Sequence, residues 1–448
     1  MRALGIDIGT TTVSGIVMDS ESRKAEEAYT IENSSFIRSD QQWEKLQDPE
    51  IIISKVKGLL DKVLDVYKDI GVIGLTGQMH GIVYINREGT HVSPLYTWQD
   101  KRGNEKHFEN KSVCEILRQK CGIQAYSGYG TVTHFYNAMT EQVPDGAESF
   151  CTVMDYLGMI LTGRKSPLVH AGNAAGLGMY DVKKGSFISE VFKKMSTGME
   201  ILPEITEELE ILGTYKGIPV CVAIGDNQAS FLGSVDSAKD TILVNMGTGG
   251  QVSVYTEEYF SVDGIETRPF LKGSYILAGS SLCGGRAYAL LERFFRQYAE
   301  ALGIKDTDHY EIMEGLLRSG NINGDRLRVD TRFAGTREKP ALRGAIENIG
   351  TDNFTPAALI QGVLEGMAEE LYEMYVSIEN TIHIPKTKII ASGNGIRKNV
   401  FLQEIVSRRF ARELYLAEQK EEAACGAAKA GLMAVKELSV LDTLGINR

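Results

Sequence analysis

The chain begins with two short apolar runs that are joined by a polar turn. Residues 3–8 and 13–18 are rich in Ile, Leu, Val and Met, and glycine and threonine fill the stretch between them. Apolar runs of this length, bounded by turn residues, are typical of β-strands. The pattern therefore predicts a β-hairpin with hydroxyl groups at its bend.

The same pattern returns about 240 residues later. Residues 241–255 again place two apolar runs around a turn, where Gly247 and Thr248 take the positions of Gly9 and Thr10. Such self-similarity within one chain indicates that a single architecture has been duplicated.

Helical and strand patterns alternate between and after the two hairpins. Helical periodicity occurs at residues 49–67, 286–301 and 355–379, and short apolar runs occur at residues 72–75 and 219–224. This alternation predicts layered α/β domains, and 448 residues are enough for two hydrophobic cores. We place the domains at residues 1–238 and 239–448, with the junction within residues 236–243.

Composition and charge exclude several classes of function. The formal net charge is −11, so no basic surface is expected to neutralise a nucleic-acid backbone. The six cysteines form no C-x-x-C pair, which argues against a zinc site and against a disulfide framework. With neither a leader pattern nor an apolar run of membrane-spanning length, we expect a cytoplasmic protein that is not embedded in a membrane.

The two Gly-Thr turns are candidates for binding a nucleotide triphosphate. Phosphates bind where backbone N–H groups and hydroxyls come close, and glycine permits this approach because it lacks a Cβ atom. Either turn alone could be an ordinary hairpin turn. The sequence has no P-loop and no dinucleotide-binding fingerprint, so the duplicated turn is the remaining candidate.

Two aspartates follow apolar strands. Asp7 ends the first run, where a carboxylate is costly unless it is paired, so it is a candidate for organising Mg²⁺ through water, with turn capping as the alternative. Asp226 follows a strand and a glycine and could be only a helix N-cap. As a general base it would take the proton from a sugar hydroxyl that attacks the γ-phosphate, while Asn227 binds a neighbouring hydroxyl.

Two further segments could contact a polyol. Gln78, Met79 and His80 lie between glycines and offer the mixed polar and apolar surface that a sugar needs, although a lone histidine is more often structural. Trp98 is close in sequence to Asp100 and Arg102, which could hydrogen-bond a polyol or could form only a surface salt bridge. The strand, glycine turn and helix at residues 389–399 could border an adenine ring or be an ordinary strand-to-helix turn.

Eight segments, taken together and in order, resemble the FGGY carbohydrate kinases, and within them most closely the sedoheptulokinases, with xylulokinases a step further away. The resemblance covers essentially the whole chain. At Asn227, where sedoheptulokinases often have leucine, the sequence is closer to the xylulokinase pattern. The segments are residues 7–12, 76–81, 97–102, 172–175, 225–228, 246–249, 364–367 and 392–395.

The resemblance implies two actin-like (ribonuclease H-like) domains with an interdomain cleft, with sugar and catalytic base in the first domain and ATP in the second. It implies that Asp226 is the base and that Asp7 organises Mg²⁺. The implied sugar-binding residues are Gln78, Met79, His80, Asn173 and Asn227, and to these we add the polyol candidates Trp98, Asp100 and Arg102. The implied ATP-binding residues are Thr10, Thr11, Thr12, Gly247, Thr248, Gly284, Gly393 and Asn394.

The function that follows is ATP- and Mg²⁺-dependent phosphorylation of a small ketose such as sedoheptulose, which would give sedoheptulose 7-phosphate. A xylulokinase or another pentulose or polyol kinase is the alternative. We less favour an actin-like or chaperone-like ATPase, because no partner-binding extension is evident. We also less favour a catalytically inactive sugar-binding regulator, because every expected motif is present. We expect a monomer or a homodimer.

Overall fold

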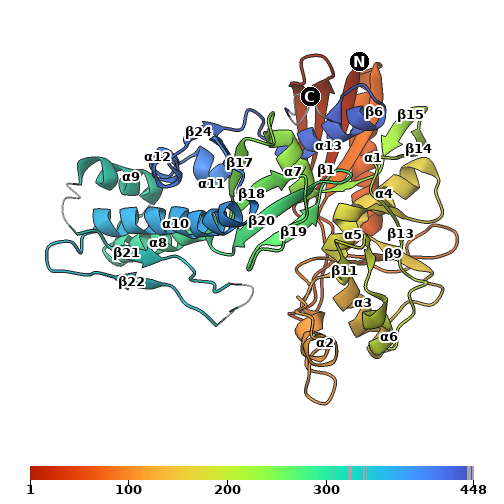
Figure 1. Ribbon diagram of the computed structural model, residues 1–448, viewed down its shortest axis with the longest axis horizontal. Coiled ribbons are helices and arrows are strands. Elements are labelled where there is room, and N and C mark those ends of the chain that lie inside the picture. The colour runs from red at the N-terminus through yellow and green to blue at the C-terminus, as the bar shows by residue number, and fades with distance from the viewer. Residues whose placement is uncertain (306, 321–324, 337–338, 340, 441–444, 446–448) are drawn as a thin grey trace. The chain divides into compact units, whose positions relative to one another are not determined.

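The computed structural model describes residues 1–305, 307–320, 325–336, 339, 341–440 and 445. They divide into two compact units. The first unit comprises Met1–Asp236, Arg268–Tyr275 and Glu421–Arg448, and the second comprises Ser237–Thr267 and Ile276–Lys420. The first unit therefore includes α13 (Glu422–Ala434), the last helix among the described residues, which lies beside the first strands in Figure 1.

A mixed sheet forms the centre of the first unit. Its strand order is β14-β15-β6-β1-β2-β3, and the short strand β16 also pairs with β6. The bounds are β1 (Arg2–Ile8), β2 (Thr12–Asp19), β3 (Ala25–Glu32), β6 (Ile70–Gly77), β14 (Ile211–Tyr215), β15 (Ile218–Cys221) and β16 (Ile224–Gly225). Strands β1 and β2 are the predicted hairpin, and β6 runs parallel to β1 on its other side.

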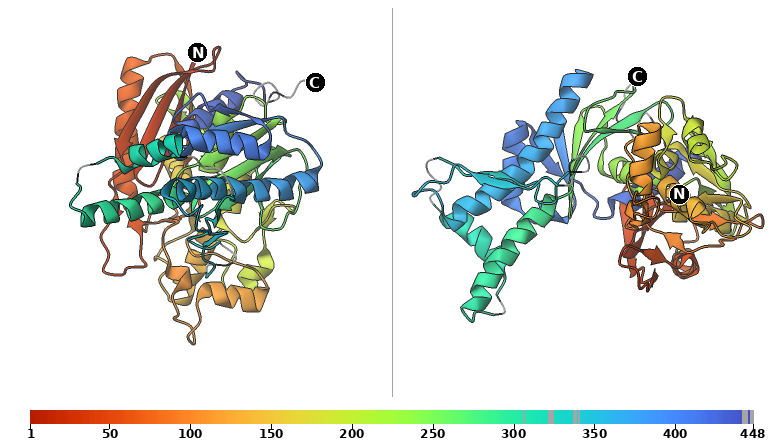
Figure 2. Two further views of the ribbon diagram at one scale, coloured as in Figure 1. Left: turned by 90° about the vertical axis from the view of Figure 1, so that its left-hand side faces the viewer. Right: turned by 90° about the horizontal axis from the view of Figure 1, so that it is seen from below.

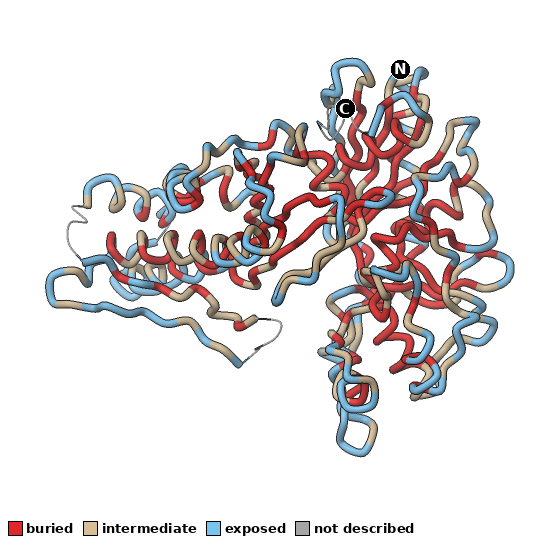
Figure 3. Tube along the Cα trace, viewed as in Figure 1, coloured by how far each residue is buried: buried red, intermediate tan, exposed pale blue. Residues whose placement is uncertain are grey.

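Helices cover both faces of this sheet. Helix α13 (Glu422–Ala434) packs on β1 and β6, and α7 (Asp226–Ser234) packs against α13. On β6, Gly74 faces α13, and the next residue, Leu75, points to the opposite face, which α4 (Val153–Thr162) covers. Figure 3 shows that the central strands are almost entirely buried.

Helix α1 (Pro49–Val66) illustrates how the sequence sets an element's bounds. The Asp48 side chain accepts hydrogen bonds from the backbone N–H groups of Glu50 and Ile51, and Pro49 occupies the first turn. An apolar stripe that includes Val56 is buried in the core. The helix predicted at residues 49–67 is confirmed.

Smaller elements complete the first unit. The short strands are β4 (Phe36–Ile37), β5 (Leu46–Gln47), β7 (Val83–Ile85), β8 (Leu95–Tyr96), β9 (Ser149–Cys151), β10 (Leu168–His170), β11 (Tyr180–Asp181), β12 (Ser186–Phe187) and β13 (Glu204–Thr206). The helices are η1 (Arg102–Asn104), α2 (Val113–Cys121), α3 (Gly130–Met139), α5 (Ala171–Leu177) and α6 (Ser189–Lys194).

The second unit repeats the arrangement of the first. Strands β17 and β18 form an antiparallel hairpin, and β23 runs parallel to β17 on its other side, as β6 does beside β1. The sheet order is β19-β20-β18-β17-β23-β24. The bounds are β17 (Thr241–Met246), β18 (Gly250–Thr256), β19 (Glu266–Pro269), β20 (Tyr275–Ser281), β23 (Lys388–Ser392) and β24 (Glu413–Leu416).

Helix α10 (Pro356–Ile382) is the longest helix of the second unit among the described residues, and it packs against α8, α9, α12 and strand β18 (Figure 2). The predicted helices at residues 286–301 and 355–379 correspond to α8 and α10. The remaining elements are α8 (Gly284–Ala301), α9 (His309–Ser319), β21 (Arg328–Asp330), β22 (Ala345–Glu347), α11 (Asn394–Arg397) and α12 (Val400–Phe410). None of the helices in the described part of the chain combines the length and apolar character needed to cross a bilayer.

The contact between Gly74 and α13 leaves no room for a side chain. A Cβ atom on Gly74 would lie 1.8 Å from the carbonyl oxygen of Ala427, so Gly74→Ala must push α13 away from the sheet. We expect a loss of about 1–3 kcal/mol or more of unfolding free energy, seen as a lower melting temperature in a calorimetric scan. Gly58→Ala is the matched control, because Gly58 is exposed in α1 with no atom within 4 Å of the added Cβ. An equal effect of the two substitutions would contradict this packing.

Candidate active site

Two aspartates lie at the carboxyl ends of β1 and β16, the two strands that flank the end of β6 in the first unit. Asp7 on β1 is in register with Thr76 of β6, and β16, paired with the end of β6, leads directly to Asp226. Burial, together with the negative charges of Asp226 and Glu421, raises the pKa of Asp7 to about 7. Burial also raises the pKa of Asp226.

This concentration of negative charge favours a cation. Unlike the pKa of Asp7, the pKa of Asp226 is held down in part by the positive charge of Arg268 and by the backbone N–H of Asn227. No three His, Cys, Asp or Glu side chains converge on one point among the described residues. A cation here would therefore take much of its coordination shell from water or from a ligand, as Mg²⁺ commonly does.

The first Gly-Thr turn is held in place by side chains from outside the hairpin. Asn33 Nδ2 donates to the carbonyl of Gly9 at 2.8 Å, and Gln47 Nε2 donates to the carbonyl of Thr10 at 2.8 Å. Thr11 and Thr12 are exposed, whereas Thr10 is only partly exposed. The turn thus keeps a fixed shape while its next two residues remain accessible.

Gln78 and Trp98 are both connected to this turn. Trp98 Nε1 donates to Thr10 Oγ1 at 3.0 Å, and this hydroxyl lies 3.4 Å from Gln78 Oε1. Gln78 is buried, and its Nε2 donates to Gln47 Oε1 at 2.8 Å. Trp98 is 47% exposed and can offer an aromatic face to a ligand, whereas the Gln78 amide is occupied in supporting the turn.

His80 has an unusual backbone conformation and a firmly oriented ring. Its φ is +73°, in the left-handed region, which is uncommon for a residue other than glycine. Its Nδ1 lies 2.6 Å from the carbonyl oxygen of Gly176, which can only accept, so Nδ1 carries the proton. The ring stacks on Tyr129 at 4.6 Å between centroids, and Met79 packs nearby against Gly176. Tyr129 was not among the predicted site residues.

Asn173 is fully buried and its amide nitrogen is engaged within the protein. Nδ2 donates to the carbonyl of Ala223 at 3.0 Å and to Asp155 Oδ1 at 3.3 Å. The side chain thus lies beneath the surface, which differs from the sequence prediction of a residue that lines the sugar pocket. Asn227, one residue after Asp226 on α7, is partly exposed. Asp155 was not predicted, although an acid inside an otherwise apolar helical run was a usable signal.

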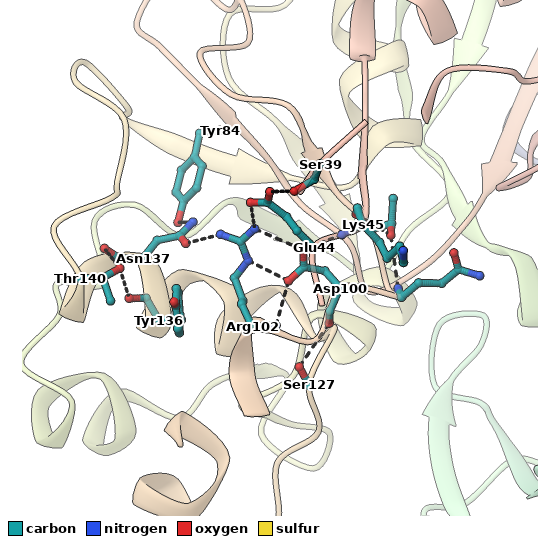
Figure 4. Close-up of polar contacts among 12 residues, drawn as sticks. Ser39, Glu44, Lys45, Tyr84, Asp100, Arg102, Ser127, Tyr136, Asn137 and Thr140 are labelled. Carbon is teal, nitrogen blue, oxygen red and sulfur yellow. Dashed lines mark hydrogen bonds and ion pairs between the residues drawn. The ribbon is translucent and has the colours of Figure 1, made fainter. Parts of the chain in front are cut away.

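Asp100 and Arg102 form a buried ion pair, shown in Figure 4. Arg102 Nε donates to Asp100 at 2.8 Å, Nη1 donates to Asn137 at 2.8 Å and Nη2 donates to Glu44 at 3.2 Å. The guanidinium also lies 4.2 Å from the centre of the Tyr96 ring. Neither member of the pair is more than 2% exposed, so the salt bridge is not at the surface, and both side chains hold the loop that carries Trp98.

The second Gly-Thr turn is bound by the first turn of α8. The backbone N–H groups of Gly285 and Arg286 donate to the carbonyls of Gly247 and Thr248, both at 3.0 Å. A Cβ atom on Gly284 would lie 2.3 Å from the carbonyl carbon of Gly249. Glycine at this position therefore permits the close approach of helix and turn.

A cavity of about 930 Å³ lies in the second unit. Three residues with a predicted ATP-binding role, Gly247, Thr248 and Asn394, line it, and so do Tyr288 and Tyr310. The two tyrosine rings stack at 5.6 Å between centroids. In the sequence, α10 lies between these tyrosines and residues 389–399. No local sequence pattern could therefore show that both line the same cavity.

Gly393 is not among the residues that line this cavity. Its φ is +85°, and a Cβ atom there would lie 2.7 Å from the carbonyl oxygen of Met246. Glycine therefore allows β23 to turn into α11 directly beside β17.

Comparisons with known proteins agree with this architecture. The family model described as the FGGY family of carbohydrate kinases, N-terminal domain, matches residues 2–233, and the C-terminal domain model matches residues 242–435. A sedoheptulokinase of Mus musculus is 24% identical over 95% of this chain and 96% of its own length. A xylulose kinase of Staphylococcus xylosus is 25% identical over 89% of this chain and 84% of its own length.

Solved structures share the fold. The crystal structure of a xylulose kinase from Rhodospirillum rubrum covers 100% of this chain and 92% of its own length, with a TM-score of 0.84 at 19% identity. The predicted fold class, α/β with two actin-like (ribonuclease H-like) domains, is confirmed. Since the two family models together span almost the whole sequence, the chain belongs to the FGGY family of carbohydrate kinases.

Proposed function

We propose that this carbohydrate kinase uses ATP to phosphorylate a small ketose, with sedoheptulose as the first candidate and xylulose as the second. The observation that carries the proposal is the position of Asp226, which follows β16 at the carboxyl end of the sheet, is partly exposed and has a raised pKa. The names of the mouse and Staphylococcus relatives support these two sugars in particular. Xylulose remains the second candidate because Asn227, which follows Asp226, is closer to the xylulokinase pattern.

In the proposed reaction Asp226 acts as general base. Its carboxylate accepts the proton of one sugar hydroxyl while that oxygen forms a bond to the γ-phosphorus of ATP and the bond to the β–γ bridging oxygen breaks, releasing ADP. A raised pKa suits this role, because a base is most effective when its pKa lies close to the working pH.

We assign sugar contacts to Trp98, which is exposed, to Asn227 and His80, which are partly exposed, and to the buried Met79. The exposed face of Trp98 can pack on the C–H side of a sugar, and Asn227 can bind a hydroxyl. His80, with its proton on Nδ1, has Nε2 as an acceptor for a hydrogen bond from a sugar hydroxyl. Met79 supplies apolar surface beside Gly225.

We assign the nucleotide to the two Gly-Thr turns and to the cavity of the second unit. Thr10, Thr11 and Thr12 are proposed to bind phosphate oxygens, together with Gly247 and Thr248. The cavity of about 930 Å³, which Asn394 and the two stacked tyrosines line, is large enough for the nucleoside. In this proposal residues 1–238 bind the sugar and supply the first phosphate-binding turn, and residues 239–448 bind the remainder of ATP.

The acids of the first unit fit Mg²⁺. Asp7 is only partly exposed, and the negative charges of Asp226 and Glu421 lie near enough to raise its pKa, so a divalent cation would relieve this repulsion. We propose that Asp7 holds the ion through water. When bound, Mg²⁺ neutralises charge on the transferred phosphoryl group.

The first test is ADP release from Mg·ATP with a panel of sedoheptulose, xylulose, ribulose, fructose and glycerol. We expect one ketose to give by far the highest kcat/KM. Asp226→Asn, which preserves the shape of the side chain, should lower kcat with that sugar by a factor of about 10² to 10⁴, because the base is lost. Tight ATP binding with no response to any sugar would favour the ATPase or regulator hypothesis. Near-normal turnover by Asp226→Asn would refute the assignment of the base.

A second test uses the raised pKa of Asp7. Because the folded protein holds this proton more tightly than the unfolded chain, folding stability should fall as pH rises from about 4 and level off above about 7. Asp7→Asn has no such group, so its melting temperature should decline less over this range. At pH 8, Mg²⁺ should raise the melting temperature of the wild type and have little effect on Asp7→Asn. Equal stabilisation of both proteins would show that the ion binds elsewhere.

A further inference from the structure

Two buried side chains bind consecutive carbonyl groups immediately before Asp226. Asn173 Nδ2 donates to the carbonyl of Ala223 at 3.0 Å, and Thr76 Oγ1 donates to the carbonyl of Ile224 at 2.7 Å. Both side chains are fully buried. They come from distant parts of the chain, β6 and α5, and meet at this one short segment.

The segment is buried in the core, but its pairing with the sheet is short. Strand β16 consists only of Ile224–Gly225, and its register with β6 covers the same two residues. Helix α7 begins directly afterwards, and its N-cap, Gly225, has no side chain with which to cap the helix. The side-chain hydrogen bonds to the two carbonyls therefore add specific anchors to the packing and the short strand pairing at this junction.

Asp155 and Thr152 fix the orientation of Asn173. Asp155 Oδ1 accepts from Asn173 Nδ2 at 3.3 Å, and Asp155 Oδ2 accepts from Thr152 Oγ1 at 2.6 Å. Nδ2 has two hydrogens, and the carboxylate and the Ala223 carbonyl take one each. The amide plane is thereby set, and all four groups lie out of contact with solvent.

We propose that Thr76 and Asn173, with Asp155 behind Asn173, are positioning residues that hold residues 223–224 so that Asp226 keeps its catalytic placement. This inference rests on the proposed function, in which Asp226 is the general base. The three side chains do not touch the sugar in this proposal. They act through the backbone that leads to Asp226, where a displacement of about 1 Å can lower the rate about 100-fold.

The closest matched pair of variants is at Thr76. Thr76→Val keeps the branched shape and removes the donor, and Thr76→Ser keeps the hydroxyl. With the panel sugar of highest kcat/KM, we expect Thr76→Val to lower kcat at least tenfold with little change in the KM for sugar. Thr76→Ser should retain most of the activity. A normal kcat in Thr76→Val, or a change confined to KM, would overturn the proposal.

Substitutions at Asn173 distinguish a positioning role from a role in sugar binding. Asn173→Leu has a similar volume and no donor, so it should lower kcat while the Kd for sugar, measured by calorimetry, stays unchanged. Asp155→Leu should behave in the same way, whereas Asp155→Asn retains an acceptor for Asn173 and should be milder. A large rise in the sugar Kd of Asn173→Leu would mean that this side chain contacts the sugar and would overturn its role as a positioning residue.

A double-mutant cycle tests whether the effect passes through Asp226. In the Asp226→Asn background, Thr76→Val should cause no further loss of the residual rate, because the group that it positions is already gone. An undiminished tenfold loss would overturn the proposal. Hydrogen exchange of the peptide that covers residues 222–228 should be faster in Thr76→Val than in Thr76→Ser. This measurement needs no activity. It therefore still tests whether Thr76 holds residues 223–224 in place, even if the activity assays contradict Asp226 as the base.

Discussion

The first unit depends on the close packing of one helix, α13, against three elements that carry candidate site residues. Cβ atoms at Gly5 of β1 and Gly74 of β6 would lie 1.9 Å and 1.8 Å from carbonyl oxygens of α13. On the other side of the helix, a Cβ atom at Gly233 of α7 would lie 1.9 Å from the carbonyl oxygen of Glu422. Backbone-to-backbone contact of this kind tolerates little sliding, so α13 fixes the mutual positions of β1, β6 and α7. The same packing therefore holds the residues at the ends of these elements, including Asp7 and Asp226, in fixed positions.

The same rigidity makes it possible to keep several carboxyl groups in a poorly solvated place. Asp7, Asp155 and Asp226 all have pKa values raised mainly by burial. Asp155 accepts hydrogen bonds from two side chains inside the protein. Asp7 lies near the negative charges of Asp226 and Glu421, whereas Asp226 is opposed by the positive charge of Arg268 and the backbone N–H of Asn227. In the proposed function the structure thus separates a supporting acid, Asp155, from the two acids that act on ligands.

The sequence predicted the fold well because the relevant signals are local. The two hairpins, helix α1 and the strand that leads to Asp226 follow from periodicity, turn residues and capping within short windows. The sequence did not predict that α13, near the end of the chain, packs on the sheet of the first unit. No local pattern tells which sheet a helix rich in small residues will pack on. The sequence analysis also did not single out Tyr129 and Tyr310. Each stacks on a ring that is distant in sequence, His80 and Tyr288 respectively, so no short window shows the contact.

The candidate site was harder to predict, because polar residues that touch a ligand and polar residues that support the backbone look alike in a sequence. Arg102 and Trp98 occur in one segment, yet the guanidinium is buried among Asp100, Asn137 and Glu44 while the indole is half exposed. Only burial and the count of satisfied donors separate the two roles. The separation also bears on specificity. In the proposed function the buried supports constrain where the backbone lies, and the more exposed polar and aromatic groups distinguish one sugar from another. Differences in substrate among kinases built on such a frame should therefore arise at positions equivalent to Trp98, His80 and Asn227 more readily than at Arg102 or Asn173.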